Sequence, residues 1–276
     1  MENNHKRYNF FKGALGILFR VAYRPKYENI ENIPTEGPII VCGNHIHLYD
    51  QCLPILSTKR MLHYMAKKEY FDGPFAWFFK ASGCISVNRS IHDESAKEKA
   101  LEVLNNGYGL GIYPEGTRNQ LASSTKKDRC EKVYEYYKKD MTYKKFYKTI
   151  KKNYVRLTQI DLLEELLDKK KITKKEFKKY AIAEFKDLNE LVERKIVSKN
   201  KLMDALLLPT KFGVVSMAQK TGATIVPYAI TGKYDHSRTL KIKFLETFKV
   251  EKDESLEDAN KKLRNILIKG IYEGNK

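Results

Sequence analysis

Four short apolar runs, each followed directly by polar or charged residues, constrain the fold of this chain most strongly. They read IIVCG, GCISV, GLGIY and ATIVPYAIT, and they start at Ile39, Gly83, Gly109 and Ala223. Their length and β-branched residues are typical of buried strands. Helical composition at 93–104 and 211–220 precedes the third and fourth runs. Strands that alternate with helices predict an α/β layer structure, with functional groups gathered where the strands end.

Residues 122–204 differ from the rest because they are rich in Lys and contain neither Gly nor Pro. This composition predicts an all-helical segment. Within it, Glu165–Phe177 and Glu190–Leu202 align without a gap, and each copy places Thr173 or Ser198 where it can cap the next helix. We interpret them as two helical hairpin units, with chance similarity as the alternative. The sequence predicts an N-terminal amphipathic helical segment at 1–29. The main domain follows in two parts, 30–121 and 205–276, and the helical segment at 122–204 interrupts it.

The N-terminal stretch Phe10–Tyr23 is apolar, but it is shorter than a membrane-spanning helix and carries Lys12 and Arg20. It predicts either an interfacial helix or an ordinary packed helix. In the interfacial case, the side chains below the headgroups are Phe10, Phe11, Leu15, Leu18 and Phe19. The four cysteines lack CxxC spacing and no secretory signal is evident, so we expect reduced thiols in a cytosolic environment.

The segment NHIHLYD directly follows the first predicted strand and carries the sharpest chemical signal. In a strand-to-helix turn, Asp50 can accept a hydrogen bond from one imidazole nitrogen of His45 and leave the other nitrogen free as a base. No Ser or Cys is plainly placed as a nucleophile, so the base would act on a substrate hydroxyl. Arg89 and Arg118, which follow two other runs, can bind a phosphate through their planar guanidinium groups. Together these residues predict a phosphorylated alcohol as substrate, whereas each alone would be read as a structural pair or a surface cation.

The order of four motifs resembles the glycerolipid acyltransferase family, which includes the lysophosphatidic acid (1-acylglycerol-3-phosphate O-) acyltransferases. The motifs are NHxxxxD at 44–50, GxIxVxR at 83–89, YPEGTR at 113–118 and IVP at 225–227. The likeness covers roughly residues 30–118 and 207–232. It implies an α/β fold with a mixed sheet flanked by helices, into which the helical segment is inserted.

The resemblance also implies the chemistry. His45 is expected to be the general base and Asp50 to orient it, while the acceptor hydroxyl attacks the thioester of acyl-CoA or acyl carrier protein. The expected product is phosphatidic acid in phospholipid biosynthesis, formed from 1-acylglycerol 3-phosphate. No metal or organic cofactor is implied, because the thioester is a co-substrate. The positions that match substrate-binding residues are Arg89, Glu115, Gly116, Thr117, Arg118 and Lys67.

Two departures leave the acceptor open. His47 stands where the family often has a small hydroxyl residue, and Asn88 stands where an acidic residue commonly precedes the arginine. Glycerol 3-phosphate or another lysophospholipid is therefore an alternative acceptor. A different alternative is a metal-dependent hydrolase, since His45, His47 and Asp50 have ligand types suited to a metal.

The basic character of the chain bears on its partners. The net charge of +18 favours an anionic partner: a nucleic acid, an acidic membrane face or a phosphorylated small molecule. For the helical segment, an ordinary solvated face explains the charges, an anionic lipid surface comes next, and nucleic acid is the least favoured partner. With a lipid substrate, we expect a peripheral or monotopic enzyme on the cytoplasmic face of a membrane.

Overall fold

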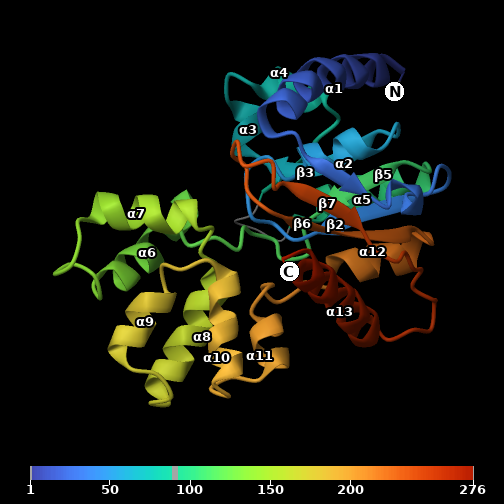
Figure 1. Cartoon of the computed structure of the whole chain (residues 1–276). Helices are drawn as coiled ribbons and strands as arrows, with labels where there is room; N and C mark the ends of the chain where they lie inside the picture. Colours follow the sequence, from blue (N-terminus) through green and yellow to red (C-terminus); the bar gives the residue numbers. More distant parts are fainter. Residues whose placement is uncertain (1, 89–92, 276) are drawn as a thin grey trace.

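The computed structural model describes residues 2–88 and 93–275 (Figure 1). The strands are β1 (Lys26–Glu28), β2 (Ile39–Gly43), β3 (Leu62–Lys67), β4 (Ile85–Val87), β5 (Gly109–Ile112), β6 (Thr224–Thr231) and β7 (Lys241–Phe244). The helices of the sheet layers are α1 (Glu2–Tyr23), α2 (Cys52–Ser57), α3 (Glu69–Asp72), α4 (Ala76–Ala81), α5 (Glu94–Asn105), α12 (Gly213–Thr221) and α13 (Leu256–Gly274). The remaining helices are α6 (Lys127–Tyr134), α7 (Tyr143–Lys152), α8 (Leu157–Asp168), α9 (Lys174–Tyr180), α10 (Asn189–Glu193) and α11 (Lys199–Asp204). Single 3₁₀ turns are η1 (Ile30–Asn32), η2 (Ser124–Lys126) and η3 (Phe185–Leu188).

The strands form one mixed sheet in the order β1-β7-β6-β2-β5-β3-β4. All neighbouring strands are parallel except β6 and β7, which are antiparallel. All four predicted apolar runs contain strands, and the predicted mixed α/β sheet is confirmed. Strands β2, β5 and β6 are neighbours at the centre, so the polar loops that follow them meet at one edge of the sheet.

The central strand β2 is apolar throughout because helices cover both faces of the sheet. Its even-numbered residues, Ile40 and Cys42, belong to a core that includes residues of α5, α12 and α13. Its odd-numbered residues, Ile39 and Val41, belong to a second core with Phe19 of α1 and Leu53 of α2. Successive side chains of a strand point to opposite faces, so this one strand contributes to both cores.

Helix α1 covers one face of the sheet and contacts α2 and α4 (Figure 1). Phe10, Leu15 and Leu18 are exposed, as an interfacial helix requires. The expectation was wrong for Phe19, which is buried against Tyr23 and Tyr234 because it lies on the side of α1 that faces the protein. Within the described ranges, no helix combines the length and apolar character needed to cross a membrane.

Helices α6 to α11 lie together beside the sheet layers (Figure 1) and have an apolar core of their own, with members from Leu121 to Ala205. The predicted helical character of this segment is confirmed. The predicted caps are present as well: the hydroxyl of Thr173 accepts from the amide of Glu176, and that of Ser198 accepts from the amide of Lys201. Such caps satisfy amides that a helix leaves unpaired at its N-terminus.

Candidate active site

The loop after β2 is fixed at its first residue, Asn44, which is fully buried. The side-chain amide of Asn44 donates to the carbonyl of Ile230 at 2.9 Å, and its oxygen accepts from the Ile230 amide at 2.7 Å. Just before it, Gly43 lies so close to β6 that a Cβ atom would be 2.3 Å from the ring of Tyr228. The glycine lets the strands pack, and the asparagine ties the start of the loop to β6.

His45 and Asp50 form the predicted pair, with 2.8 Å between His45 Nδ1 and Asp50 Oδ2. Asp50 is completely buried, and it also accepts from the amides of Ile46 at 2.6 Å and His47 at 2.8 Å and from the Tyr234 hydroxyl at 2.6 Å. Four donors surround this one side chain, so it acts as an acceptor only. We therefore assign the His45 proton to Nδ1, which leaves the lone pair of Nε2 available to a substrate.

The imidazole of His45 is oriented on its face as well as at its edge. The ring of Tyr113 stacks on it with 3.9 Å between centroids and 10° between planes. The His45 side chain keeps 17% exposure and lines a pocket of about 420 Å³ on the α5 and α12 face of the sheet. Other lining residues are Met65, Asn88, Tyr113, Gly116 and Lys211. The His45 imidazole therefore lines a cavity large enough for part of a substrate.

Glu115 holds two loops together from a buried position. Its Oε1 accepts from the amide of His45 at 2.7 Å, and its Oε2 accepts from the amide of Leu208 at 2.9 Å. Burial raises the pKa of Glu115 to about 8, although the two amides and Arg156 lower it. Both oxygens are occupied by backbone donors, which fits the ordering of this loop better than a contact to a substrate hydroxyl.

The remaining residues of the YPEGTR motif form the turn beside the pocket. Gly116 has φ 68°, a left-handed conformation that favours glycine, and a Cβ atom there would be 3.0 Å from Lys211 Nζ. Thr117 and Arg118 are partly buried. Burial lowers the pKa of His47, and the positive charges of Arg118 and Lys151 lower it further. Within residues 2–88 and 93–275, Arg118 has no carboxylate partner, so it is available to bind an anion.

Of the remaining predicted site residues, Lys67 does not line the His45 pocket, and Arg89 lies outside the described part of the chain. Lys67 lies at the end of β3, paired in register with Val87 of β4. Asn88, which precedes Arg89 and is the other departure from the motif, lines the pocket.

His47 makes contacts that order the loop after β2. Its ring stacks on Tyr234 with 4.2 Å between centroids, and its Nδ1 accepts from the amide of Tyr49 at 3.3 Å. Over the described ranges, no group of three or more His, Cys, Asp and Glu side chains is arranged to hold a metal ion. The four thiols are unpaired cysteines.

Sequence reasoning missed Tyr234 and Lys211. Tyr234 follows β6 and reaches Asp50 from 184 positions further along the chain. Lys211, whose amide donates to the Pro114 carbonyl at 2.9 Å, precedes α12 and reaches the turn at Gly116. Neither residue carries a local motif, so only the fold reveals them.

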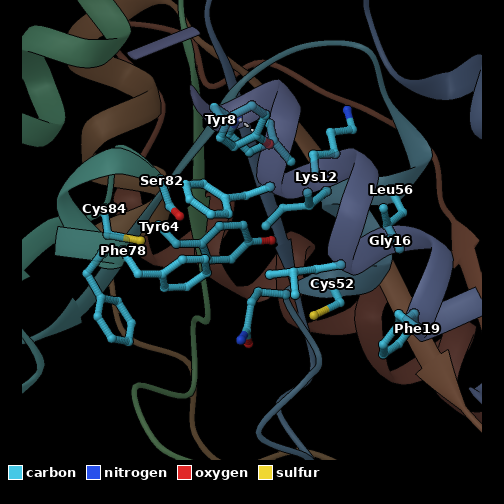
Figure 2. Close-up of a pocket in the computed structure, with 16 residues that line it drawn as sticks. Tyr8, Lys12, Gly16, Phe19, Cys52, Leu56, Tyr64, Phe78, Ser82 and Cys84 are labelled. Atoms are coloured by element: carbon cyan, nitrogen blue, oxygen red, sulfur yellow. Dashed lines mark hydrogen bonds between the residues drawn. The ribbon is translucent and has the colours of Figure 1, made fainter. Parts of the chain in front are cut away.

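A second, apolar pocket of about 150 Å³ lies beneath α1 on the opposite face of the sheet (Figure 2). Its walls include Tyr8, Phe19, Leu56, Tyr64, Phe78 and Cys84. The ring of Tyr64 is 6.0 Å from that of Tyr113, which in turn stacks on His45. His45 thus lies at the edge of the sheet between the pocket that it lines on one face and the apolar pocket under α1 on the other.

Comparisons with known proteins agree with this geometry. The family model described as Acyltransferase matches residues 24–231. The 1-acyl-sn-glycerol-3-phosphate acyltransferase of Borreliella burgdorferi is 39% identical over 93 residues, which is 33% of this chain and 37% of that protein. The enzyme of the same name from Bacillus subtilis is 29% identical over 113 residues, which is 40% of this chain and 57% of that protein. The aligned parts therefore span less than two thirds of either relative.

The fold has a counterpart among solved structures. The crystal structure of the 1-acyl-sn-glycerophosphate (LPA) acyltransferase PlsC from Thermotoga maritima matches with a TM-score of 0.55 and 18% identity. The match covers 98% of this chain and 78% of that one. At this identity the likeness concerns the fold.

Proposed function

The chain belongs to the acyltransferase family, and from that premise we propose that it transfers a fatty acyl group from a thioester to the free hydroxyl of 1-acylglycerol 3-phosphate, giving phosphatidic acid. The observation that carries this proposal is the His45–Asp50 pair, in which Asp50 holds Nδ1 of an imidazole that lines a pocket. The names of the two curated relatives support the choice of acceptor.

The reaction requires one base and no protein nucleophile. Nε2 of His45 takes the proton of the acceptor hydroxyl as its oxygen attacks the thioester carbonyl. The new C–O bond forms, the C–S bond breaks, and the leaving thiolate takes the proton back from the imidazolium. Asp50 stabilises that imidazolium and keeps its ring in place, as a buried carboxylate does in a hydrolase triad. A metal is not needed for any of these steps, and the four protein donors around Asp50 fit a positioning role better than a ligand role.

We propose that the phosphate of the acceptor binds to cations beside the turn at Gly116. Arg118 follows the turn at Gly116, and Lys211 lines the pocket beside the same turn. A planar guanidinium and an ammonium suit phosphate oxygens. Arg89 and Lys67 stay predictions from the family motif, and Thr117 is proposed to shape the turn. Glycerol 3-phosphate remains the alternative acceptor, because the same cations would bind its phosphate.

The apolar pocket under α1 is proposed to take part of the acyl chain. Its walls are mostly apolar (Figure 2). One of them, Tyr64, has its ring 6.0 Å from that of Tyr113, which stacks on His45. A lipid substrate must also leave a membrane. We propose that the enzyme lies peripherally or monotopically on an anionic membrane, at its cytoplasmic face. Exposed apolar side chains of α1 and of the α3–α4 region support this: Phe10, Leu15, Ile17, Leu18, Val21, Phe75 and Trp77.

Membrane binding has a direct test. Sedimentation with vesicles that contain phosphatidylglycerol should bring down the wild type, and Leu18→Ser with Trp77→Ser should reduce the bound fraction several-fold at low salt. Phe212→Ser, at an exposed residue directly before α12, is the matched control. Equal sedimentation of all three proteins would exclude this face as the membrane contact.

The reaction is tested by thiol release from acyl-CoA and from acyl carrier protein thioesters in detergent, with 1-acylglycerol 3-phosphate, glycerol 3-phosphate or no acceptor. We expect release that depends on 1-acylglycerol 3-phosphate and that falls to background in His45→Ala. Release that is equal with and without acceptor would mean thioester hydrolysis. Activity that is abolished by chelator and restored by zinc or manganese would favour the hydrolase alternative.

A further inference from the structure

Tyr234 and His45 contact different oxygens of the Asp50 carboxylate. Its hydroxyl donates to Asp50 Oδ1 at 2.6 Å, while His45 Nδ1 lies 2.8 Å from Oδ2. Tyr234 is buried, and its ring is packed between His47 on one side and the aromatic residues of α1 on the other. The position of this hydroxyl therefore decides how the carboxylate is turned toward the imidazole.

Tyr234 is in turn held by the helical segment. Its backbone amide donates to the hydroxyl of Tyr154 at 3.0 Å. Tyr154 follows α7 and has φ 51°, a left-handed conformation that is uncommon for a bulky residue and is found where surrounding contacts impose it. Those contacts are present: the Tyr154 amide donates to Lys151, and Val155 next to it bonds to Ile150 and Leu121.

The same segment reaches His45 from a second direction. The amide of Asn119 donates to the carbonyl of His45 at 2.8 Å, and the side chain of Asn119 donates to the hydroxyl of Thr158 on α8 at 3.0 Å. Buried Arg156, which precedes α8, interacts electrostatically with Glu115, whose carboxylate accepts from the His45 amide. Thus α8 and the end of α7 support the catalytic loop on both sides.

We infer that the helical segment is a structural part of the active site, and that Tyr154 acts as a positioning residue for the His45–Asp50 pair through Tyr234. The inference rests on the proposed role of His45 as the base. Tyr154 does not contact the reacting atoms. It fixes the backbone of Tyr234, which fixes the hydroxyl on Asp50, which fixes the imidazole.

The test compares three single hydroxyl deletions. Tyr234→Phe removes the donor to Asp50, and Tyr154→Phe removes the acceptor for the Tyr234 amide. Tyr134→Phe is the matched control, because its hydroxyl donates to the Met141 carbonyl within the same helical segment and is not part of this chain of contacts. We expect kcat to fall about tenfold in Tyr234→Phe and about threefold in Tyr154→Phe, as the loss of one hydrogen bond would give, with KM nearly unchanged.

The pH profile separates positioning from a merely structural role. Without the hydrogen bond from Tyr234, the negative charge of Asp50 is less neutralised, so Asp50 stabilises the imidazolium form of His45 more strongly. The acidic limb of kcat/KM should then move to higher pH in Tyr234→Phe and, less, in Tyr154→Phe. A loss of folded enzyme would lower the rate without moving this limb. Other titratable groups that face the pair, and that are unchanged in these variants, are His47, Cys52, Tyr113, Glu115 and Tyr228. Arg118 faces His47 beside them.

A spectroscopic measurement keeps the inference testable without turnover. The proton between His45 Nδ1 and Asp50 should give a downfield proton resonance that disappears in His45→Ala. We expect this resonance to shift in Tyr234→Phe and Tyr154→Phe and to stay in place in Tyr134→Phe. An unmoved resonance and an unmoved acidic limb in Tyr154→Phe would overturn the inference. A wild type that shows the resonance and its shifts but transfers no acyl group would instead overturn the proposed function.

Discussion

The loops at the sheet edge and the helical segment are held together by different interactions. At the sheet edge, Asn44, Asp50 and Glu115 are buried polar residues, and each is satisfied by backbone or side-chain donors and acceptors. In the helical segment, the buried residues are mostly apolar, and the charges form ion pairs on the surface, such as Glu165 with Lys169. Hydrogen bonds at the sheet edge fix the positions of a few polar groups, whereas an apolar core stabilises the helical segment.

This difference predicts how each region responds to substitution. Removing one partner from a buried polar group leaves the other unsatisfied, so the effect is large and local. Removing buried carbon from an apolar core costs stability in proportion to the cavity left behind. Removing an exposed charge costs little. The four substitutions below test this contrast.

The largest effect is expected from Asp50→Asn. The NH₂ group of Asn would point at one of the four groups that donate hydrogen bonds to Asp50. The ring of His45 would then lose its orientation, and the imidazolium would lose its counterion. We expect acceptor-dependent thiol release to fall about 10²-fold to 10⁴-fold. Asp161→Asn, an exposed carboxylate of the helical segment, is the control and should keep full activity. A fall of less than tenfold in Asp50→Asn would show that the pair does not carry the reaction.

A large loss of stability is expected from Phe146→Ala in the core of the helical segment. Phe146 is fully buried and packs against Tyr134 and Tyr137. We expect the free energy of unfolding to fall by about 3–5 kcal/mol, measured by urea denaturation. Phe212→Ala, at an exposed phenylalanine, should change it by less than about 1 kcal/mol. Equal effects of the two substitutions would mean that the helical segment does not depend on its apolar core.

An intermediate, pH-dependent effect is expected at Glu115. Its folded pKa of about 8 exceeds the ordinary 4.5, so the folded protein keeps a proton that the unfolded chain loses in between. The stability from this group is fully present below about pH 4.5 and is lost as the pH rises through about 8. Glu115→Gln should flatten the fall in unfolding free energy between these values by a few kcal/mol. Exposed Glu135→Gln should leave the curve unchanged, and a parallel curve for Glu115→Gln would contradict the assignment.

The smallest effect is expected from Glu165→Gln. Hydrogen bonds from Lys169 and Lys201 lower the pKa of Glu165 to about 2, so its contribution to stability is present above about pH 4.5 and is lost as the pH falls through about 2. All three side chains are exposed, and screening by solvent leaves less than about 1 kcal/mol. Urea midpoints at low salt and in 1 M salt should differ between wild type and variant only at low salt. A fall in the free energy of unfolding of more than about 2 kcal/mol would show that these surface ion pairs contribute substantially to stability.

The sequence was most informative where a signal is local. The apolar runs predicted β2, β4, β5 and β6, and the spacing of His45 and Asp50 predicted their contact within one loop. The composition of 122–204 predicted helices, and its Thr and Ser residues predicted caps. In each case the residues that interact are neighbours along the chain, so a pattern of a few positions carries the information.

Contacts between distant segments could not be predicted in this way. The partners of Glu115 lie 70 and 93 positions away, and Tyr234 lies 184 positions from Asp50. Strand β1 has only three residues, too few for a periodic pattern. Strand β7 is different, because KIKF alternates polar and apolar residues and α13 has a clear apolar stripe, so both carried a signal that was not used.

Identifying the lipid product tests the proposed acyl transfer most directly. Wild type and His45→Gln would be incubated with 1-acylglycerol 3-phosphate and a thioester that carries an isotopically labelled acyl chain, and the lipids would be identified by mass spectrometry. Acyl transfer with His45 as the base predicts labelled phosphatidic acid from the wild type and none above background from His45→Gln, because glutamine cannot take the hydroxyl proton. Labelled phosphatidic acid in equal amount from both proteins, or only labelled free fatty acid from the wild type, would contradict it.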